Sequence, residues 1–155
     1  MKKTLFSLIF SAALLAGIVS DVNAQTVSGS IGNGTISRGG SARGTIVLSV
    51  PGGLHVNSNR PGNAYQIPTT IRITAVGAKA GAVSYPRGKN RSFSFSDGTI
   101  NVYEGRTAFN FNVTVPKKFK GNVVRIRAVV KYQACTDEVC YPPKSKEITL
   151  TATVK

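Results

Sequence analysis

The sequence is dominated by segments in which apolar and polar side chains alternate one by one. Successive side chains of a β-strand point to opposite faces of its sheet, so a period of two is typical of strands with one buried face. The pattern predicts strands over residues 45–50, 71–75, 109–115, 124–132 and 148–154. After the first 24 residues, no window has the 3.6-residue period of an amphipathic helix.

Turn signals that contain glycine fall between these segments, at residues 51–53, 61–63, 97–98, 104–105 and 120–121. Seven or more short strands with regular turns within about 110 residues predict an all-β fold, an immunoglobulin-like antiparallel β-sandwich. The chain has no tryptophan, and its two cysteines are near neighbours. It therefore lacks the core tryptophan and the inter-sheet disulfide of antibody domains.

The N-terminal residues are typical of a secretory signal peptide over residues 1–24. Two lysines follow Met1, an apolar run extends from Leu5 to Val19, and residues 22–24 (VNA) offer small side chains where a signal peptidase would cut. Residues 25–43 are rich in glycine and serine and predict a flexible lead-in with one short strand. Residues 44–155 then form a single domain. We expect a periplasmic or secreted protein without a membrane span of its own.

The chain is strongly basic, with a formal charge of +14. Removal of the signal peptide takes away Lys2, Lys3 and Asp21, which leaves about +13. Such a charge attracts acidic partners, anionic lipid head groups or nucleic acid, or simply keeps a protein soluble. The basic residues are scattered along the predicted strands, so the sequence indicates a solvated surface. Export argues against nucleic acid as a partner.

The two cysteines, Cys135 and Cys140, stand in the segment ACTDEVCYPP. A disulfide that closes a loop of about six residues stabilises a protein by only on the order of 2 kcal/mol, so the pair would be a weak staple. It lies between two predicted strands, at an end of the sandwich, where connections present reactive groups to partners. Pro142 and Pro143 restrict the backbone beside Cys140.

Metal binding and tuning of the thiols by charge are alternative roles for residues of this region. The cysteines and His55 fall short of the four ligands of a structural zinc site, and we expect no metal. His55 is expected instead to pack or form hydrogen bonds at the start of a strand. Asp137 and Glu138 lie between the cysteines and either tune the thiols, because negative charge disfavours a thiolate, or simply solvate the loop tip.

The segment YQACTDEVCYPPK, residues 132–144, resembles the active-site segment of the N-terminal periplasmic domain of DsbD, a thiol:disulfide interchange protein. The similarity extends through GLHVNSNRPG, IPTTIRI, YPRGK and INVYEG, and covers roughly residues 44–155. It implies an immunoglobulin-like domain that transfers electrons by thiol–disulfide exchange and needs no cofactor.

The resemblance also implies roles for individual residues. Cys140 would form the mixed disulfide with a partner, and Cys135 would resolve it. The residues that flank the cysteines in the matching segment are expected to shape the site: Tyr132, Tyr141 and Pro142.

The family has a cap loop whose aromatic side chain covers the thiols until a partner displaces it. RSFSFSDG, residues 91–98, falls in the corresponding stretch. Phe95 is the first candidate for the cap and Phe93 the second. The alternative is ordinary strand alternation, in which both rings face the core.

The resemblance implies thioredoxin-like redox proteins or disulfide isomerases as partners, including those of cytochrome c maturation. We expect a monomer whose membrane electron donor is a separate polypeptide, because neither a membrane span nor a thioredoxin-like segment follows in this sequence. A hypothesis of another class is a non-catalytic binding or scaffold module, with an inert disulfide and a basic partner-binding surface. An inert disulfide should resist reduction, with a potential below about −300 mV.

Overall fold

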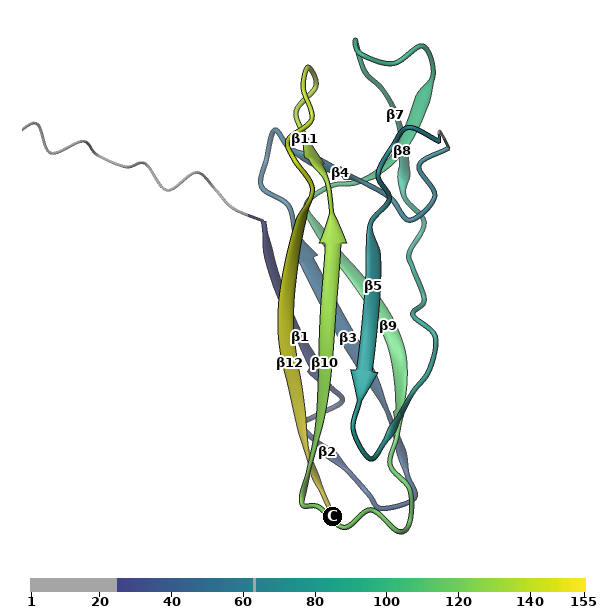
Figure 1. Ribbon diagram of the computed structural model, residues 1–155, viewed down its shortest axis with the longest axis vertical. Coiled ribbons are helices and arrows are strands. Elements are labelled where there is room, and N and C mark those ends of the chain that lie inside the picture. The colour runs from purple at the N-terminus through teal and green to yellow at the C-terminus, as the bar shows by residue number, and fades with distance from the viewer. Residues whose placement is uncertain (1–24, 63) are drawn as a thin grey trace, which may run out of the picture.

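Figure 1 presents the protein as a computed structural model, in which residues 25–62 and 64–155 are described. The described residues form β-strands, turns and loops. The signal peptide expected over residues 1–24 lies outside them. Across the described ranges, no helix is long and apolar enough to cross a membrane.

Two four-stranded sheets build the body of the molecule (Figure 1). The first has the order β1 (Thr26–Ile31), β3 (Ser41–Ser49), β9 (Arg106–Thr114) and β6 (Lys79–Ala80). The second has the order β2 (Thr35–Ile36), β12 (Lys144–Val154), β10 (Val123–Tyr132) and β5 (Thr70–Ala75). Neighbouring strands are antiparallel, except that β2 runs parallel to β12. The all-β immunoglobulin-like sandwich is confirmed.

The alternating pattern decides which face of each strand is buried. The inward side chains of β3 and β9 pack against those of β10 and β12 in one hydrophobic core. Fully buried members are Ile46, Leu48, Phe109, Val113, Val124, Ile126, Ala128 and Val130. All five strands predicted from the alternation are present with the expected face inward.

Residues 25–43 are not a flexible lead-in, and this expectation was wrong. Strand β1 pairs with β3 along its whole length, and β2 pairs with the end of β12. Ile31 and Ile36 from this segment are buried in the core. Three of its glycines serve turns between strands: Gly32, Gly34 and Gly39 have the positive φ angles that tight turns require.

A third sheet covers one end of the sandwich (Figure 1). Its order is β11 (Ala134–Cys135), β4 (His55–Asn57), β8 (Thr99–Tyr103) and β7 (Lys89–Ser92). We call this end the cysteine pole. The last strand ends at the opposite end of the molecule, beside β2 and the β9–β10 connection.

Candidate functional site

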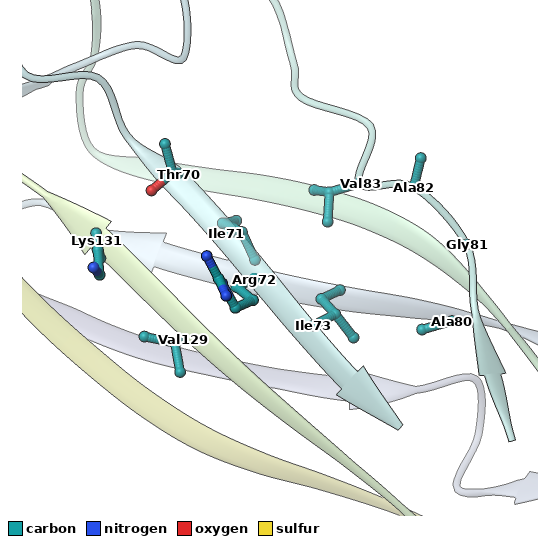
Figure 2. A pocket seen from close by; sticks show the side chains of 10 residues that line it. All are labelled: Thr70, Ile71, Arg72, Ile73, Ala80, Gly81, Ala82, Val83, Val129 and Lys131. Atoms are coloured by element: carbon teal, nitrogen blue, oxygen red, sulfur yellow. The ribbon is translucent and has the colours of Figure 1, made fainter. Parts of the chain in front are cut away.

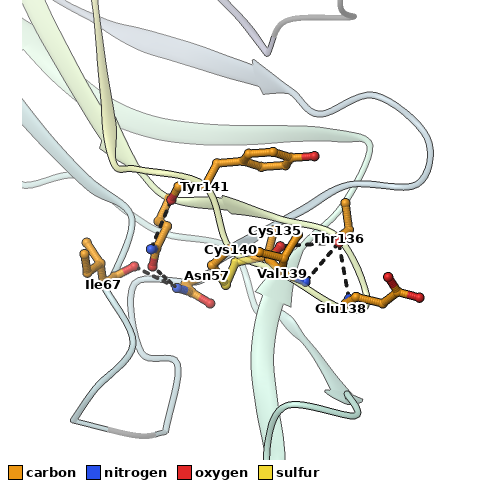
Figure 3. The surroundings of a disulfide bond; sticks show 9 residues. Asn57, Ile67, Cys135, Thr136, Glu138, Val139, Cys140 and Tyr141 are labelled. Carbon is orange, nitrogen blue, oxygen red and sulfur yellow. Dashed lines mark hydrogen bonds between the residues drawn. A yellow bond between two sulfur atoms is a disulfide. The ribbon is translucent and has the colours of Figure 1, made fainter.

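Cys135 and Cys140 form a disulfide at the base of a β-hairpin tip (Figure 3). Their Cα atoms are 4.0 Å apart. On one side of the pair, the amide of Tyr141 donates to the carbonyl of Ala134 at 2.8 Å, and on the other the amide of Thr136 donates to the carbonyl of Val139 at 2.8 Å. The cysteines therefore lie directly opposite each other on two antiparallel segments.

Thr136 organises the tip of this hairpin. Its Oγ1 accepts hydrogen bonds from the amides of Val139 at 3.0 Å and Glu138 at 3.2 Å. A threonine hydroxyl that binds nearby amides replaces the backbone partners a tight turn lacks. These hydrogen bonds do not involve the sulfur atoms, so the tip has a source of order besides the disulfide.

The two cysteines differ in exposure. Cys135 is fully buried, whereas Cys140 is partly exposed. The cause is the register of the third sheet: β11 also pairs with β4, which sets Cys135 opposite His55. Cys140 lies on the outer side of the hairpin. An approaching molecule therefore meets Cys140 before Cys135.

A short chain of amide side chains supports the hairpin from the side of β4 (Figure 3). Asn57 Nδ2 donates to the carbonyl of Ile67 at 3.0 Å and to Oε1 of Gln133 at 3.4 Å. Gln133 Nε2 in turn donates to the carbonyl of Tyr141 at 3.1 Å. Sequence reasoning missed Asn57 and Gln133, because nothing local marks residues 76 positions apart as partners.

Phe93 and Phe95 lie in the turn between β7 and β8, where the amide of Ser96 donates to the carbonyl of Phe93 at 3.1 Å. Phe95 is 38% exposed, so the alternative in which both rings face the core as strand residues is wrong.

The two rings belong to a stack that begins at His55. The centroids of His55 and Phe93 are 4.1 Å apart with planes 15° from parallel, and those of Phe93 and Phe95 are 5.2 Å apart with planes 5° from parallel. Ser94 Oγ donates to the backbone carbonyl of Asp137 at 3.2 Å. The β7–β8 turn thus contacts the cysteine hairpin tip directly.

His55 is buried at the start of β4, as expected, and its Nε2 has no hydrogen-bond partner among the described residues. Burial lowers the pKa of the imidazole below 6.5, and Arg91 acts in the same direction. Asp137 and Glu104 oppose this by attracting the charged form. Burial is the largest effect, so the neutral ring is the stable form at neutral pH.

A surface groove of about 720 Å³ lies beside the stack. Arg91 and Glu104 both line this groove. The Arg91 guanidinium donates two hydrogen bonds of 2.8 Å to the carboxylate of Glu104, and Lys89 Nζ donates a third at 3.3 Å. The Arg91 hydrogen bond is the main cause that lowers the pKa of Glu104 below 4.5. Six lining residues carry charge or an aromatic ring: His55, Arg91, Phe93, Glu104, Asp137 and Glu138.

The remaining predicted site residues divide between core and surface. Tyr132 is fully buried, its hydroxyl has no hydrogen-bond partner within the described part of the chain, and burial raises its pKa. Tyr141 and Pro142 are exposed. Asp137 and Glu138 are exposed at the hairpin tip. Exposed apolar side chains flank Cys140 in the chain, at Val139 and Tyr141, and a third, Phe95, lies on the β7–β8 turn.

A second groove runs along the flank of the sandwich, between β5 and residues 80–83 (Figure 2). Ile71, Ile73 and Val83 line it, and Lys131 lies at one end. Its lining contains no cysteine, histidine or carboxylate. Among the described residues, no group of three histidine, cysteine or acidic side chains is placed to hold a metal ion. The reactive groups are concentrated at the cysteine pole.

Comparisons with known proteins give a family match and solved structures of similar fold. The family described as thiol:disulfide interchange protein DsbD, N-terminal, matches residues 35–152. The N-terminal periplasmic domain of ScsB from Proteus mirabilis has a similar fold, with a TM-score of 0.54 and 13% identity over 80% of this chain. The match spans 44% of that ScsB chain. The reduced DsbD N-terminal domain of Neisseria meningitidis gives a TM-score of 0.42 and 20% identity, over 71% of this chain and 80% of its own. A search of the curated proteins found no match.

Proposed function

The chain belongs to the family of DsbD N-terminal domains, and on that premise we propose that it is a periplasmic thiol–disulfide exchange module. In this proposal, the Cys135–Cys140 pair passes reducing equivalents between thioredoxin-like proteins. The observation that carries it is the position of the disulfide, at the base of a protruding hairpin tip with Cys140 partly exposed and Cys135 buried.

The chemistry is a pair of balanced exchange steps. In the reduced module, the Cys140 thiolate attacks one sulfur of a partner disulfide, and the other partner sulfur leaves as a thiolate and takes up a proton. Cys135, as a thiolate, then attacks Cys140 Sγ. The partner leaves as a dithiol, the Cys135–Cys140 bond forms, and two electrons have passed to the partner. A donor with a lower reduction potential drives the reverse sequence.

The difference in exposure supports the assignment of roles. A bulky partner can reach only an accessible sulfur, so the intermolecular bond forms at Cys140. Cys135, held between His55 and Cys140, is suited to attack a neighbour already joined to the partner. Exposed apolar side chains next to Cys140 in the chain, Val139 and Tyr141, supply surface that a partner would cover.

The β7–β8 turn serves as the cap in this proposal, with Phe95 as its outer ring and Phe93 as its inner ring. Its attachment to the hairpin tip includes one side-chain hydrogen bond, from Ser94 to Asp137, besides the stack on His55. A neutral hydrogen bond contributes only about 1 kcal/mol. The stack of Phe93 on His55 adds about 0.5–1.5 kcal/mol beyond the buried area, and a partner that covers the apolar rings would offset both contributions.

Trapping of the mixed disulfide tests the proposal. Cys135→Ala leaves Cys140 as the only thiol, and we expect a DTT-sensitive adduct with a thioredoxin whose own resolving cysteine is replaced. Cys140→Ala is the matched control, because its remaining thiol is buried, and we expect little adduct. Absence of an adduct through Cys140, or a reduction potential below about −300 mV, would favour the inert binding module instead.

A further inference from the structure

The end of the sandwich opposite the cysteines gathers positive charge. We call it the basic pole and define it by residues 36–40, 76–80, 115–125 and 154–155. These segments contain no acidic side chain and seven exposed cations: Arg38, Lys79, Lys117, Lys118, Lys120, Arg125 and Lys155. Every aspartate and glutamate of the described residues lies outside it, at Asp97, Glu104, Asp137, Glu138 and Glu147.

The fold brings these scattered cations together. The amide of Arg38 donates to the carbonyl of Lys155 at 2.7 Å, and the amide of Val115 donates to the carbonyl of Gly40 at 3.0 Å. The Arg38 guanidinium also binds the carbonyls of Phe119 and Gly121 across the end of the molecule. Strand β6 pairs with the end of β9, which sets Lys79 opposite Thr114. The cations therefore lie on turns and strand ends that are joined by backbone pairing at one end of the molecule.

An apolar groove of about 560 Å³ lies on this surface, between the β5–β6 turn and the β9–β10 connection. Val76, on the β5–β6 turn, is 79% exposed, and Val123 is 41% exposed. Phe119 lies between Gly77 and Gly121, where an added Cβ would approach its ring to 3.0 Å. Lys118, Lys120 and Arg125 line the same groove. An apolar groove rimmed by charged residues is typical of an interaction site.

We propose that the basic pole docks on an anionic lipid bilayer, with Val76 and Val123 entering the head-group region and the surrounding cations binding lipid phosphates. Lysine stems can lie along apolar surface while their amines reach phosphate oxygens. An aliphatic residue at the tip of a turn, with cations around it on several segments, suits a flat surface. The seven cations come from four separate segments and only three of them line the groove, a spread that fits the many phosphates of a lipid surface better than one peptide in the groove. Each cation near such a membrane strengthens binding roughly fivefold.

The docked orientation points the cysteine pole away from the lipid. Strand β10 has 10 residues and connects the two poles, which separates them by about 33 Å. Membrane docking would therefore leave Cys140 open to partners in solution. This inference does not depend on the proposed redox function, and either can fail without the other.

Vesicle sedimentation tests the proposal directly. The probes are vesicles that contain phosphatidylglycerol and vesicles of phosphatidylcholine alone. We expect binding to the first and none to the second. Replacing Lys117, Lys118 and Lys120 with Gln should weaken binding on the order of a hundredfold, at roughly fivefold per cation.

A matched triple variant keeps the net charge equal but changes the flank of the sandwich: Arg72→Gln, Lys131→Gln and Lys146→Gln. These residues are exposed and lie outside the basic pole. We expect this variant to bind far better than the basic-pole variant. Equal loss in both variants would mean attraction by net charge alone and would overturn the proposal, as would binding to soluble polyglutamate in preference to vesicles.

Insertion is tested with a fluorescent reporter, since the chain has no tryptophan. Val76→Trp should show a blue shift of emission on phosphatidylglycerol vesicles, because the indole leaves water. Arg60→Trp, an exposed position in the connection that follows β4, should show none. A shift at Arg60 equal to that at Val76, or no shift at Val76, would refute the orientation.

Discussion

Lowering the pH from 7 to 5 should destabilise the protein through one residue. The chain has a single histidine, His55, and histidine is the only side chain whose ordinary pKa falls in that range. His55 is buried opposite Cys135, stacks on Phe93, and has no partner for Nε2 within the described residues. When the imidazole is protonated, both ring nitrogens carry hydrogen, and the hydrogen on Nε2 has no acceptor among the described residues.

The sign and size of the effect follow from linkage. Burial holds the pKa of His55 in the folded protein below the 6.5 of the unfolded chain. Between the two values the unfolded chain binds more protons, so the free energy of unfolding falls as the pH falls. The stabilisation is complete above pH 6.5 and is lost through the window below it. Because a single proton is involved, the free energy of unfolding can fall by at most about 1.4 kcal/mol for each pH unit.

The lower end of this window is the pKa of His55 in the folded protein, which burial lowers most. Arg91 lowers this pKa further, whereas Asp137 and Glu104 raise it. The carboxyl pKa values of Glu104 and Glu147 are themselves held below 4.5 by arginine partners. Stability lost through those two carboxylates therefore appears at lower pH, and the slope between pH 5 and 6.5 reports on His55.

Urea unfolding at a series of pH values measures this slope. The wild type should lose stability below pH 6.5, and His55→Gln, which removes the titrating group, should be nearly flat over the same range. An NMR titration of the His55 ring should give a midpoint below 6.5. Equal slopes in the two proteins, or a midpoint at or above 6.5, would refute the reasoning.

Three further predictions concern the cap, the disulfide and the core. Phe95→Ala should raise the rate at which iodoacetamide alkylates the reduced thiols, and an unchanged rate would remove Phe95 from the site. Reduction of the Cys135–Cys140 disulfide should lower the free energy of unfolding, measured in urea, by about 2 kcal/mol, because the disulfide closes a short loop. A loss above about 4 kcal/mol would contradict this and make the disulfide a major source of stability. Gly44→Ala would bring a Cβ within 2.3 Å of the Phe111 ring and should cost about 1–3 kcal/mol, which thermal unfolding measures; an unchanged melting temperature would contradict the packing.

The main strands could be predicted because their signal is local in the sequence. Alternation is a property of neighbouring residues, so the inward faces of β9 and β10 could be predicted without knowing their partners. The same local character explains the failure at residues 25–43. Glycine and serine are common both in mobile segments and in tight turns, and only pairing with β3 distinguishes the two.

The alternation was itself misleading around Phe93 and Phe95. Two aromatic residues separated by Ser94 have the spacing of a strand face, but the stretch forms a turn. Its rings find a partner at His55, nearly forty positions earlier in the chain. The difference in exposure of the cysteines has a similar origin, because it depends on the pairing of Cys135 with His55. Contacts of this kind are set by the assembled sheets and leave no local signal.

The segregation of charge along the sandwich bears on both proposals. At physiological ionic strength, interactions between exposed charges are screened over about 8 Å, and the two poles are separated by about 33 Å along β10. Anionic lipid at the basic pole should therefore leave the electrostatics around Cys140 unchanged, and mixed-disulfide formation should leave lipid affinity unchanged. At the cysteine pole, Lys89 and Arg91 are paired with Glu104, and Asp137 and Glu138 add negative charge, so a lipid phosphate is attracted less strongly there than at the basic pole. The charge distribution thus favours one orientation on a membrane, and it is the orientation that keeps the disulfide accessible.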